Sequence, residues 1–132
     1  MTYSKSIGNV SINYNNFNKD EIQKNPMYMP DSNAAKLAGD MLKEKMAEMD
    51  SVGGIIECVV AGMPTGVGEP VFDKLDANLA KAIMSIGAVK GIEIGDGFAV
   101  ATSTGSKDND GFKVENGHIS KTSTMPEGFL VA

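Results

Sequence analysis

The sequence predicts a mixed fold of helices and strands, built around one apolar strand and two amphipathic helices. The run at 55–61 is rich in Ile and Val and too short for a typical helix, which favours a buried strand with both faces covered. Segments 32–48 and 71–86 repeat apolar residues every three or four positions, as helices with one buried face do. Further strands are predicted near 8–13, 90–95 and 98–103. Alternation of strands and helices alone favours a parallel sheet.

Composition limits the chain to one domain and excludes several classes of partner. The 132 residues carry a net charge of −5, and neither nucleic acid nor an anionic membrane attracts an acidic protein. No apolar run approaches the roughly 20 residues that span a bilayer. The first residues lack the apolar stretch of a signal peptide, and a single cysteine gives no disulfide framework. We therefore expect a cytoplasmic protein that binds neither nucleic acid nor membrane.

The chain before the first helix is predicted to be irregular after one short strand. The run KSIGNVSIN alternates loosely and predicts the strand at 8–13, and a domain rarely begins so abruptly, so we expect a further segment before it. Segment 15–30 is polar and contains several Met and Pro residues, which favours a loop.

The first helix, 32–48, has a clear start signal, because Asp31 or Ser32 suits an N-cap. We interpret its methionines as core residues rather than as a cofactor site. Its expected apolar face contains Leu37, Met41, Leu42, Met46 and Met49. Its solvent side contains charges at helical spacing, from Lys43, Glu44, Lys45 and Glu48.

A glycine-rich loop follows the apolar strand, because Gly62, Pro64, Gly66 and Gly68 break regular structure. The loop resembles a phosphate-binding loop only superficially, since both GxxxxGK[ST] and GxGxxG are absent. Pro70 suits the first turn of the next helix. That helix has an apolar stripe of Val71, Leu75, Leu79, Ile83 and Ile86.

Four residues with reactive side chains are interpreted as structural. Glu69 and Asp73 stand where carboxylates complement a helix dipole, which we favour over a catalytic pair of acids. Cys58 lies in the apolar strand without a second cysteine, as a buried, inert thiol does. His118 has no partner visible in the sequence, so we interpret it as a loop residue. No catalytic residue and no metal site is predicted.

Several long runs carry a resemblance to a known enzyme family. These are KNPMYMPDSNAA (24–35), DSVGGIIECVVAGMP (50–64), GVGEPVFDKLDANLAKAIMSIGAVKGIEIGDGF (66–98) and GSKDNDGF (105–112). Over nearly its whole length, the chain resembles the central part of chorismate synthase, the flavin-dependent last enzyme of the shikimate pathway. The resemblance implies an α+β fold, a fragment of the family's β-α-β sandwich in which helices pack against antiparallel strands.

The same resemblance implies a reaction and a cofactor. The reaction is the anti-1,4-elimination of phosphate from 5-enolpyruvylshikimate 3-phosphate, which gives chorismate and requires reduced FMN. The full-length family forms a homotetramer. Within SIGAVKG, Gly87 and Ala88 match the family's FMN-contacting pair, where small residues let the backbone approach the cofactor.

The chain departs from the family in the residues that carry catalysis. The family's catalytic histidines and its flavin and substrate arginines lie in segments that this sequence does not contain, and the chain has no arginine at all. His118 does not inherit their role. We therefore expect the chain alone to be inactive. The alternative is a noncatalytic module for self-association or assembly.

The last residues depart from the family in a way that the genetic code explains. After HISKT the family continues with a run like NHAGGVFSGIS, whereas this chain continues STMPEGFLVA. One permitted codon choice for 123–132, read after its first two bases are skipped, encodes Asn-His-Ala-Gly-Gly-Val-Phe-Ser-Gly. We therefore divide the chain into a central fragment, 1–122, and a frame-slipped, non-native tail, 123–132, that packs poorly and can be trimmed at little cost. The alternative is a genuine variant ending, and the gene sequence across Thr122 distinguishes the two.

Overall fold

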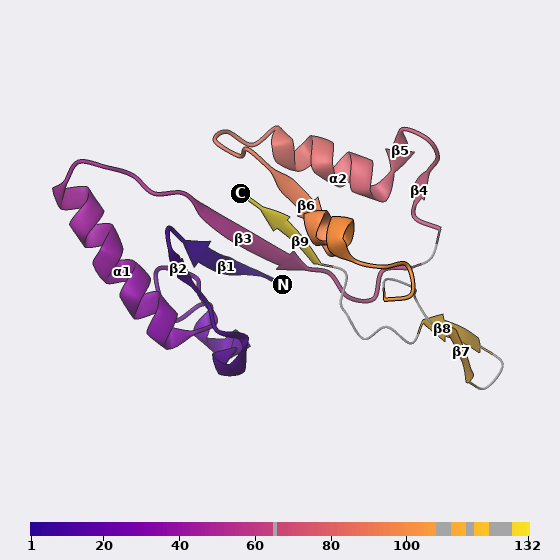
Figure 1. Ribbon diagram of the computed structural model, residues 1–132, viewed down its shortest axis with the longest axis horizontal. Helices are drawn as coiled ribbons and strands as arrows, with labels where there is room; N and C mark the ends of the chain where they lie inside the picture. The colour runs from indigo at the N-terminus through magenta and orange to yellow at the C-terminus, as the bar shows by residue number, and fades with distance from the viewer. Residues whose placement is uncertain (65, 108–111, 116–117, 122–127) are drawn as a thin grey trace.

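Five strands form one sheet at the centre of the structure, and a helix lies toward each end of the strand order (Figure 1). The computed structural model describes residues 1–64, 66–107, 112–115, 118–121 and 128–132. The sheet order is β2-β1-β3-β9-β6. Its strands are β1 (Thr2–Ile7), β2 (Val10–Ser11), β3 (Gly54–Val59), β6 (Ile92–Ile94) and β9 (Gly128–Val131). The helices are α1 (Ser32–Ala47) and α2 (Leu75–Met84).

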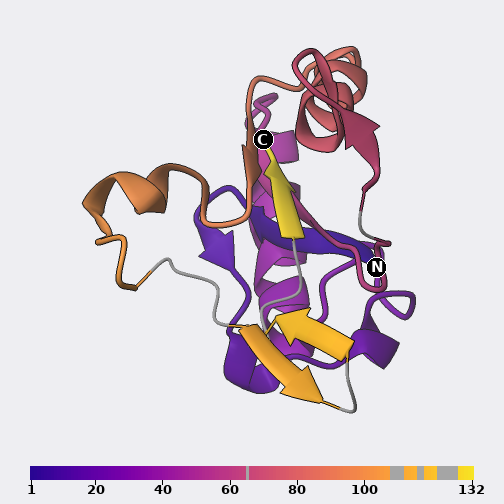
Figure 2. The ribbon, with the colours of Figure 1, turned by 90° about the vertical axis from the view of Figure 1, so that its right-hand side faces the viewer.

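Two small hairpins and three 3-10 helices complete the description. One hairpin pairs β4 (Gly68–Glu69) with β5 (Asp73–Lys74), and the other pairs β7 (Phe112–Glu115) with β8 (His118–Lys121). The 3-10 helices are η1 (Tyr14–Asn16), η2 (Lys19–Glu21) and η3 (Gly97–Thr102). Figure 2 shows η3 and the β7–β8 hairpin standing away from the central sheet.

All strand pairings in the described part of the chain are antiparallel, which confirms the predicted α+β class. β3 and β6 each run antiparallel to β9, so they are parallel to one another without being neighbours. The parallel sheet that alternation of elements favours is therefore not formed, because a strand from the end of the chain lies between the two strands that α2 connects.

The best-buried part of the core lies between α1 and the first strands. The predicted helix at 32–48 is confirmed, and Asp31 caps it by accepting hydrogen bonds from the N–H groups of Asn33 and Ala34. The buried hydrophobic residues are Tyr3, Ile12, Ile22, Met29, Ala34, Ala35 and Ala38. Small alanines at the contact let the helix approach the sheet closely.

The predicted apolar face of α1 is only partly correct. Met41 and Leu42 are half-buried, whereas Leu37, Met46 and Met49 are exposed, with Met49 lying beyond the last turn at 95% exposure. The helical period predicts the position of the helix correctly. The residues that it buries are alanines, which are less hydrophobic than methionine. Most of these methionines are therefore not core residues.

The strand predicted at 8–13 is wrong in position. The ordered strand is β1, which comes earlier, and only Val10–Ser11 pairs with it as β2. Gly8 has a φ of 55°, a left-handed conformation that suits glycine and turns the chain between the two strands. The predicted strand therefore spans a turn. By contrast, the strands predicted at 55–61 and 90–95 are confirmed as the shorter β3 and β6.

The second helix begins later than predicted. Residues 68–74 form the β4–β5 hairpin, in which Glu69 lies opposite Asp73. Pro70 therefore belongs to a hairpin turn rather than to the first turn of α2, and Val71 is 72% exposed. The interpretation of Glu69 and Asp73 as helix-dipole carboxylates is wrong, because neither lies in the helix, and Asp76 is the acid in its first turn.

The strand predicted at 98–103 is wrong in type, because those residues form the 3-10 helix η3. Gly95 and Gly97 have φ values of 61° and 51° and turn the chain away from the sheet directly after β6. Within η3 the Ala99 N–H donates to the Asp96 carbonyl. The Phe, Val and Thr content of the segment favours a strand, but the two glycines prevent the chain from continuing in that direction.

We expected a frame-slipped tail that packs poorly, but the end of the chain forms a strand inside the sheet. β9 is an inner strand, with Ile56 and Ile92 both opposite Val131. After it, Ala132 exchanges hydrogen bonds with Gly91, at 3.0 Å in each direction. The expectation that trimming costs little is therefore not supported by the geometry. The frame-slip origin and the division at 122/123 stay predictions, and residues 123–127 of this tail lie outside the described residues. In the described part of the chain, no helix is long and apolar enough to cross a membrane.

Candidate functional site

The predicted cofactor pair, Gly87 and Ala88, forms the exposed turn that joins α2 to β6. The helix ends at Met84, and Ser85 follows as its C-cap, with a hydroxyl that donates to the Ala82 carbonyl at 2.6 Å. The chain then turns over residues 86–89, closed by a 3.3 Å bond from the Val89 N–H to the Ile86 carbonyl. Gly87 and Ala88 are the two central residues of this turn, so both lie at the surface between two ordered elements.

The backbone of this turn is accessible to a ligand. A Cβ built on Gly87 meets no heavy atom within 4 Å. Among the described residues, neither the Gly87 N–H nor the Ala88 N–H donates to a partner. Ala88 has a φ of 70°, an uncommon conformation for a residue other than glycine and one that is found often at binding sites. Two free donors, with open space in front of them, fit contact with an acceptor-bearing cofactor.

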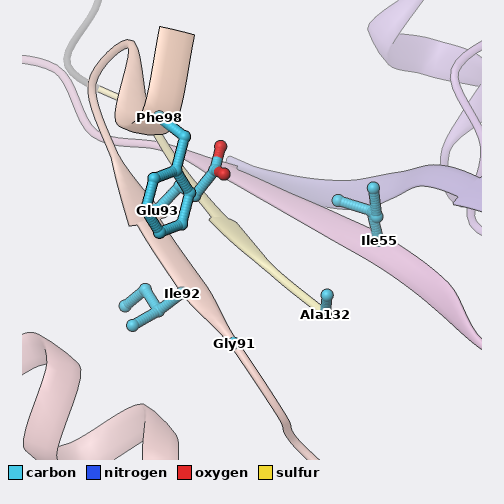
Figure 3. A pocket seen from close by; sticks show the side chains of 6 residues that line it. All are labelled: Ile55, Gly91, Ile92, Glu93, Phe98 and Ala132. Carbon is cyan, nitrogen blue, oxygen red and sulfur yellow. The ribbon is translucent and has the colours of Figure 1, made fainter. Parts of the chain in front are cut away.

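A hollow of about 180 Å³ lies beside β6, and its lining residue nearest to this turn in sequence is Gly91, three residues after Ala88. Figure 3 shows its lining residues, which come from β3, from β6 and the residue before it, from η3 and from the end of the chain: Ile55, Gly91, Ile92, Glu93, Phe98 and Ala132. Glu93 is the one lining residue with a charged side chain. Gly97 is required here, because a Cβ on it would lie 2.7 Å from the Cβ of Glu93. The hollow is therefore mostly apolar with a single carboxylate.

The end of the chain holds the turn in place from the other side. The backbone N–H of Lys90 donates to the Ala132 carbonyl at 2.7 Å, and the N–H of Gly91 donates to the same oxygen at 3.0 Å. Lys90 follows Ala88 by two residues, so the candidate turn is fixed to the sheet through β9 as well as through β6.

A second polar group, which sequence reasoning missed, surrounds Glu57 on the α1 side of the sheet. One oxygen of Glu57 accepts hydrogen bonds from the Tyr3 hydroxyl at 2.8 Å and from the Tyr14 hydroxyl at 2.6 Å. The Lys5 ammonium lies 3.8 Å from that oxygen and 5.7 Å from the centre of the Tyr14 ring. Glu57 is the one charged residue in the apolar run 55–61, and a carboxylate in a buried strand needs partners. The sequence alone therefore indicates that Glu57 has polar partners in the fold.

The Glu57 group perturbs the two tyrosines. Burial raises the pKa of Tyr3 well above its ordinary value, and the hydrogen bond to the Glu57 carboxylate raises it further. Partial burial also raises the pKa of Tyr14, reinforced by Glu57 and opposed by Lys5. Both phenols therefore stay protonated and donate to Glu57 at neutral pH. The arrangement joins η1 to the sheet, and we interpret it as structural.

The remaining candidates are placed as follows. Cys58 is half-buried rather than fully buried, and its sulfur lies 3.2 Å from the Thr2 hydroxyl. The backbone of His118 begins β8 rather than lying in a loop, and its side chain lies outside the described residues. Within the described ranges, no group of three or more His, Cys, Asp or Glu residues is arranged to hold a metal ion.

Comparison with known proteins decides the family. The sequence model of the chorismate synthase family matches residues 1–128. The chain belongs to the chorismate synthase family. It is 54% identical over 130 residues to the chorismate synthase of Agathobacter rectalis, covering 98% of this chain and 35% of that protein. The corresponding values for the Lachnoclostridium phytofermentans chorismate synthase are 52% identity, 98% of this chain and 36% of the relative.

The structural comparison agrees on the fold. A solved chain described as the crystal structure of chorismate synthase matches with a TM-score of 0.85 at 23% identity, over 98% of this chain and 47% of that chain. At this identity the match shows the fold alone, and it confirms the α+β prediction. The chain spans about a third of the length of the chorismate synthases that it matches in sequence.

Proposed function

We propose that this chain is a central segment of a chorismate synthase, which contributes one edge of a flavin site and does not catalyse by itself. The family match over residues 1–128 is the observation that carries this proposal. The reaction of the complete enzyme is the elimination of phosphate from 5-enolpyruvylshikimate 3-phosphate to give chorismate, a step of the shikimate pathway that leads to aromatic amino acids. In that reaction, bound reduced FMN supplies an electron-rich ring in a water-poor pocket.

The residues of the turn fit a contact with that cofactor. The free N–H groups of Gly87 and Ala88 are hydrogen-bond donors, and the absence of a side chain at Gly87 leaves room for a planar ring or its ribityl chain. We propose that these two residues hold FMN through their backbone. The hollow beside β6 supplies apolar surface, because the side chains of Ile55, Ile92 and Phe98 line it.

The same residues do not fit the substrate. A phosphate and a carboxylate are best held by fixed cations, and arginine supplies these with two donors in one plane. The chain has no arginine, and Lys90 is the lysine nearest to the turn in sequence. We therefore propose that substrate binding and proton transfer are carried out by other parts of a complete enzyme, including other subunits of a homotetramer.

The first test is catalysis by the chain alone. We expect no release of phosphate and no chorismate absorbance from the purified chain with excess reduced FMN and substrate under anaerobic conditions. The full-length Agathobacter rectalis enzyme is the positive control. Turnover by the chain at a thousandth of that rate, roughly the contribution of a single catalytic group, would contradict the proposal and require a role for Glu69, His118 or a lysine.

The second test is flavin binding without catalysis. Titration of the chain into FMN, followed by flavin fluorescence, should give weak saturable binding that Gly87→Leu abolishes. Gly39→Leu is the matched control, because a Cβ at Gly39 also meets no atom within 4 Å and the residue lies on α1, which contacts β2 at the opposite end of the strand order from β6. If both variants bind FMN equally well, the turn is not part of the flavin site.

A noncatalytic self-association module is the second candidate function. The observation that favours it is the number of large apolar side chains that the described part of the chain leaves exposed, among them Phe72, Phe98 and Ile56. Sedimentation velocity over a range of concentrations tests it, because a purely monomeric chain would exclude this role.

A further inference from the structure

The chain passes from β6 to η3 through a short turn that contains a reactive pair of residues. Its sequence is Gly95-Asp96-Gly97, and it follows directly after Ile94, the last residue of β6. In a pair of aspartate and glycine, the backbone nitrogen of the glycine can attack the side-chain carboxyl group of the aspartate, because no side chain shields that nitrogen. Whether such a pair reacts depends on how firmly the fold holds it.

The fold leaves the carboxylate of Asp96 without a partner among the described residues. Asp96 is exposed and stands at the N-cap position of η3, yet its side chain makes no capping hydrogen bond. Asp31 is the contrast within the same chain, because its carboxylate accepts hydrogen bonds from the backbone N–H groups of Asn13 and Asn33. The carboxyl group of Asp96 is therefore free to rotate toward the next residue.

The backbone around Asp96 is also free to move. No described residue of β6 or η3 is buried, and Figure 2 shows η3 standing away from the central sheet. Asp96 has a ψ of −1°, so its Cα–C bond must rotate before the Gly97 nitrogen reaches the side-chain carboxyl carbon. A glycine on each side, in a segment held by few buried contacts, allows this rotation through local opening at low free energy.

We propose that Asp96 isomerises to isoaspartate through a cyclic imide with Gly97. In the first step the Gly97 nitrogen forms a bond to the side-chain carboxyl carbon of Asp96, and the hydroxyl of that carboxyl group leaves as water with the proton of the nitrogen. In the second step water adds to the main-chain carbonyl carbon of Asp96 and breaks its original bond to the Gly97 nitrogen. One water leaves and one enters, so the product has the same mass and no oxidant or reductant takes part.

The product changes the connection between β6 and η3. The main chain runs through the former side chain of Asp96 and gains one carbon, while the former main-chain carbonyl becomes a free carboxylate. That carbonyl accepts a hydrogen bond from the Ala99 N–H at 3.0 Å and closes the first turn of η3. Phe98 lies in the same turn and lines the hollow together with Glu93 (Figure 3). We therefore expect isomerisation to displace η3 and the Phe98 ring, whether or not the hollow takes part in flavin binding.

The test is ageing of the purified full chain at neutral pH, followed by digestion with trypsin. Cleavage after Lys90 and Lys107 gives a peptide, 91–107, in which Asp96 is the one aspartate. Electron-transfer fragmentation distinguishes isoaspartate from aspartate at equal mass. Isoaspartate at Asp96 should accumulate with time above the level in a fresh sample, and an isoaspartyl methyltransferase should transfer a labelled methyl group to that peptide.

Two other positions in the same digest serve as controls. Asp76 lies in the first turn of α2, where its carboxylate accepts a hydrogen bond from the Ala77 N–H, so the peptide 75–81 should stay unchanged. The pair Asn116-Gly117 lies outside the described residues. It forms the same kind of imide faster, with ammonia as the leaving group, so its conversion shows that the conditions allow the reaction.

Two substitutions separate the imide route from other causes of modification. Asp96→Glu keeps the charge but requires a larger ring that closes much more slowly, so the isomer should disappear. Asp96→Asn has a better leaving group and should react faster than the native chain. The exposure of Asp96 leaves room for both side chains, and far-UV circular dichroism checks that each variant is folded.

A synthetic peptide of residues 91–107 gives the rate of the reaction without a fold. Asp96 in the folded chain should isomerise within about tenfold of that rate, as expected for an opening that costs less than about 1.4 kcal/mol. A folded chain that keeps Asp96 intact while Asn116 converts would overturn the proposal, because the fold would then protect the pair. Equal conversion of Asp76 and Asp96, or an isomer that persists in Asp96→Glu, would also overturn it.

Discussion

At the scale of single residues, a buried carboxylate joins segments that are distant in sequence. Asp31 is 3% exposed and accepts hydrogen bonds from the backbone N–H groups of Asn13, Asn33 and Ala34, with a longer contact to the Asn16 amide at 3.5 Å. Burial acts to raise the pKa of Asp31, but the N–H donors, with that of Asn13 first, outweigh it and hold the pKa below its ordinary value. The residue that caps α1 therefore also fixes the chain that follows β2.

Replacing Asp31 by alanine should lower the free energy of unfolding by about 2 kcal/mol, since the helix loses its cap and the Asn13 N–H loses its acceptor. The folded pKa is depressed, so the ionised carboxylate stabilises the fold above about pH 4, its unfolded range, and this contribution is lost as the pH falls through the folded pKa. Urea unfolding of both proteins from neutral to acidic pH measures the difference, which should shrink on acidification.

The matched control for this prediction is Asp40→Ala on the same helix. Asp40 is exposed and, among the described residues, pairs with Lys43 three residues later, a surface contact that contributes little. A change of less than about 0.5 kcal/mol is expected. Equal effects of the two substitutions would show that the cap of α1 is not the stabilising feature.

At the scale of elements, the sequence predicts what local chemistry determines and misses what tertiary contacts determine. α1 is predicted well because a cap residue and a long helical period agree. The strand expected at 98–103 is wrong because Gly97 turns the chain away from the sheet, although the composition favours a strand. The early start expected for α2 is wrong because the residues before Leu75 form the β4–β5 hairpin. Of the candidate site, Gly87 and Ala88 are placed on an accessible turn, whereas the Glu57 group depends on strand register that no local pattern specifies.

β9 is the element whose removal should have the largest effect on the sheet. Trimming the chain after Thr122 should lower the free energy of unfolding by more than about 2 kcal/mol, because several ladder hydrogen bonds to β3 and β6 are lost together. Urea unfolding of the full and trimmed chains, monitored by circular dichroism, measures this. A loss of less than about 0.5 kcal/mol, the range of neutral surface changes, would restore the view that the tail is a non-native addition.

At the scale of the whole molecule, burial is unevenly distributed along the chain. Every fully buried hydrophobic side chain among the described residues lies between Tyr3 and Ala38. From Gly62 to Lys107, no described residue is fully buried. The part that carries the candidate flavin turn is therefore held mainly by backbone pairing and partial contacts, which is the condition for local opening at low free energy.

Native-state hydrogen exchange should show this difference directly. Amides of β1 and α1 are expected to exchange only with global unfolding, whereas those of α2 and η3 should exchange through local opening at least tenfold faster, a free-energy difference of about 1.4 kcal/mol. Measurement by mass spectrometry on peptides from each element compares them within one sample. Equal protection of α1 and α2 would show that the second half is as stable as the first.

The position of β9 also sets an order of events during protein synthesis. The ribosome makes β3 and β6 well before β9, yet β9 is the strand that joins them. Until β9 is made, β1 is the one sheet partner of β3 among the described strands, and β6 has no partner in the sheet. Contacts between residues so far apart in sequence also form slowly. A nascent chain that has not yet made β9 therefore leaves one edge of β3 and both edges of β6 unpaired, and unpaired strand edges favour aggregation.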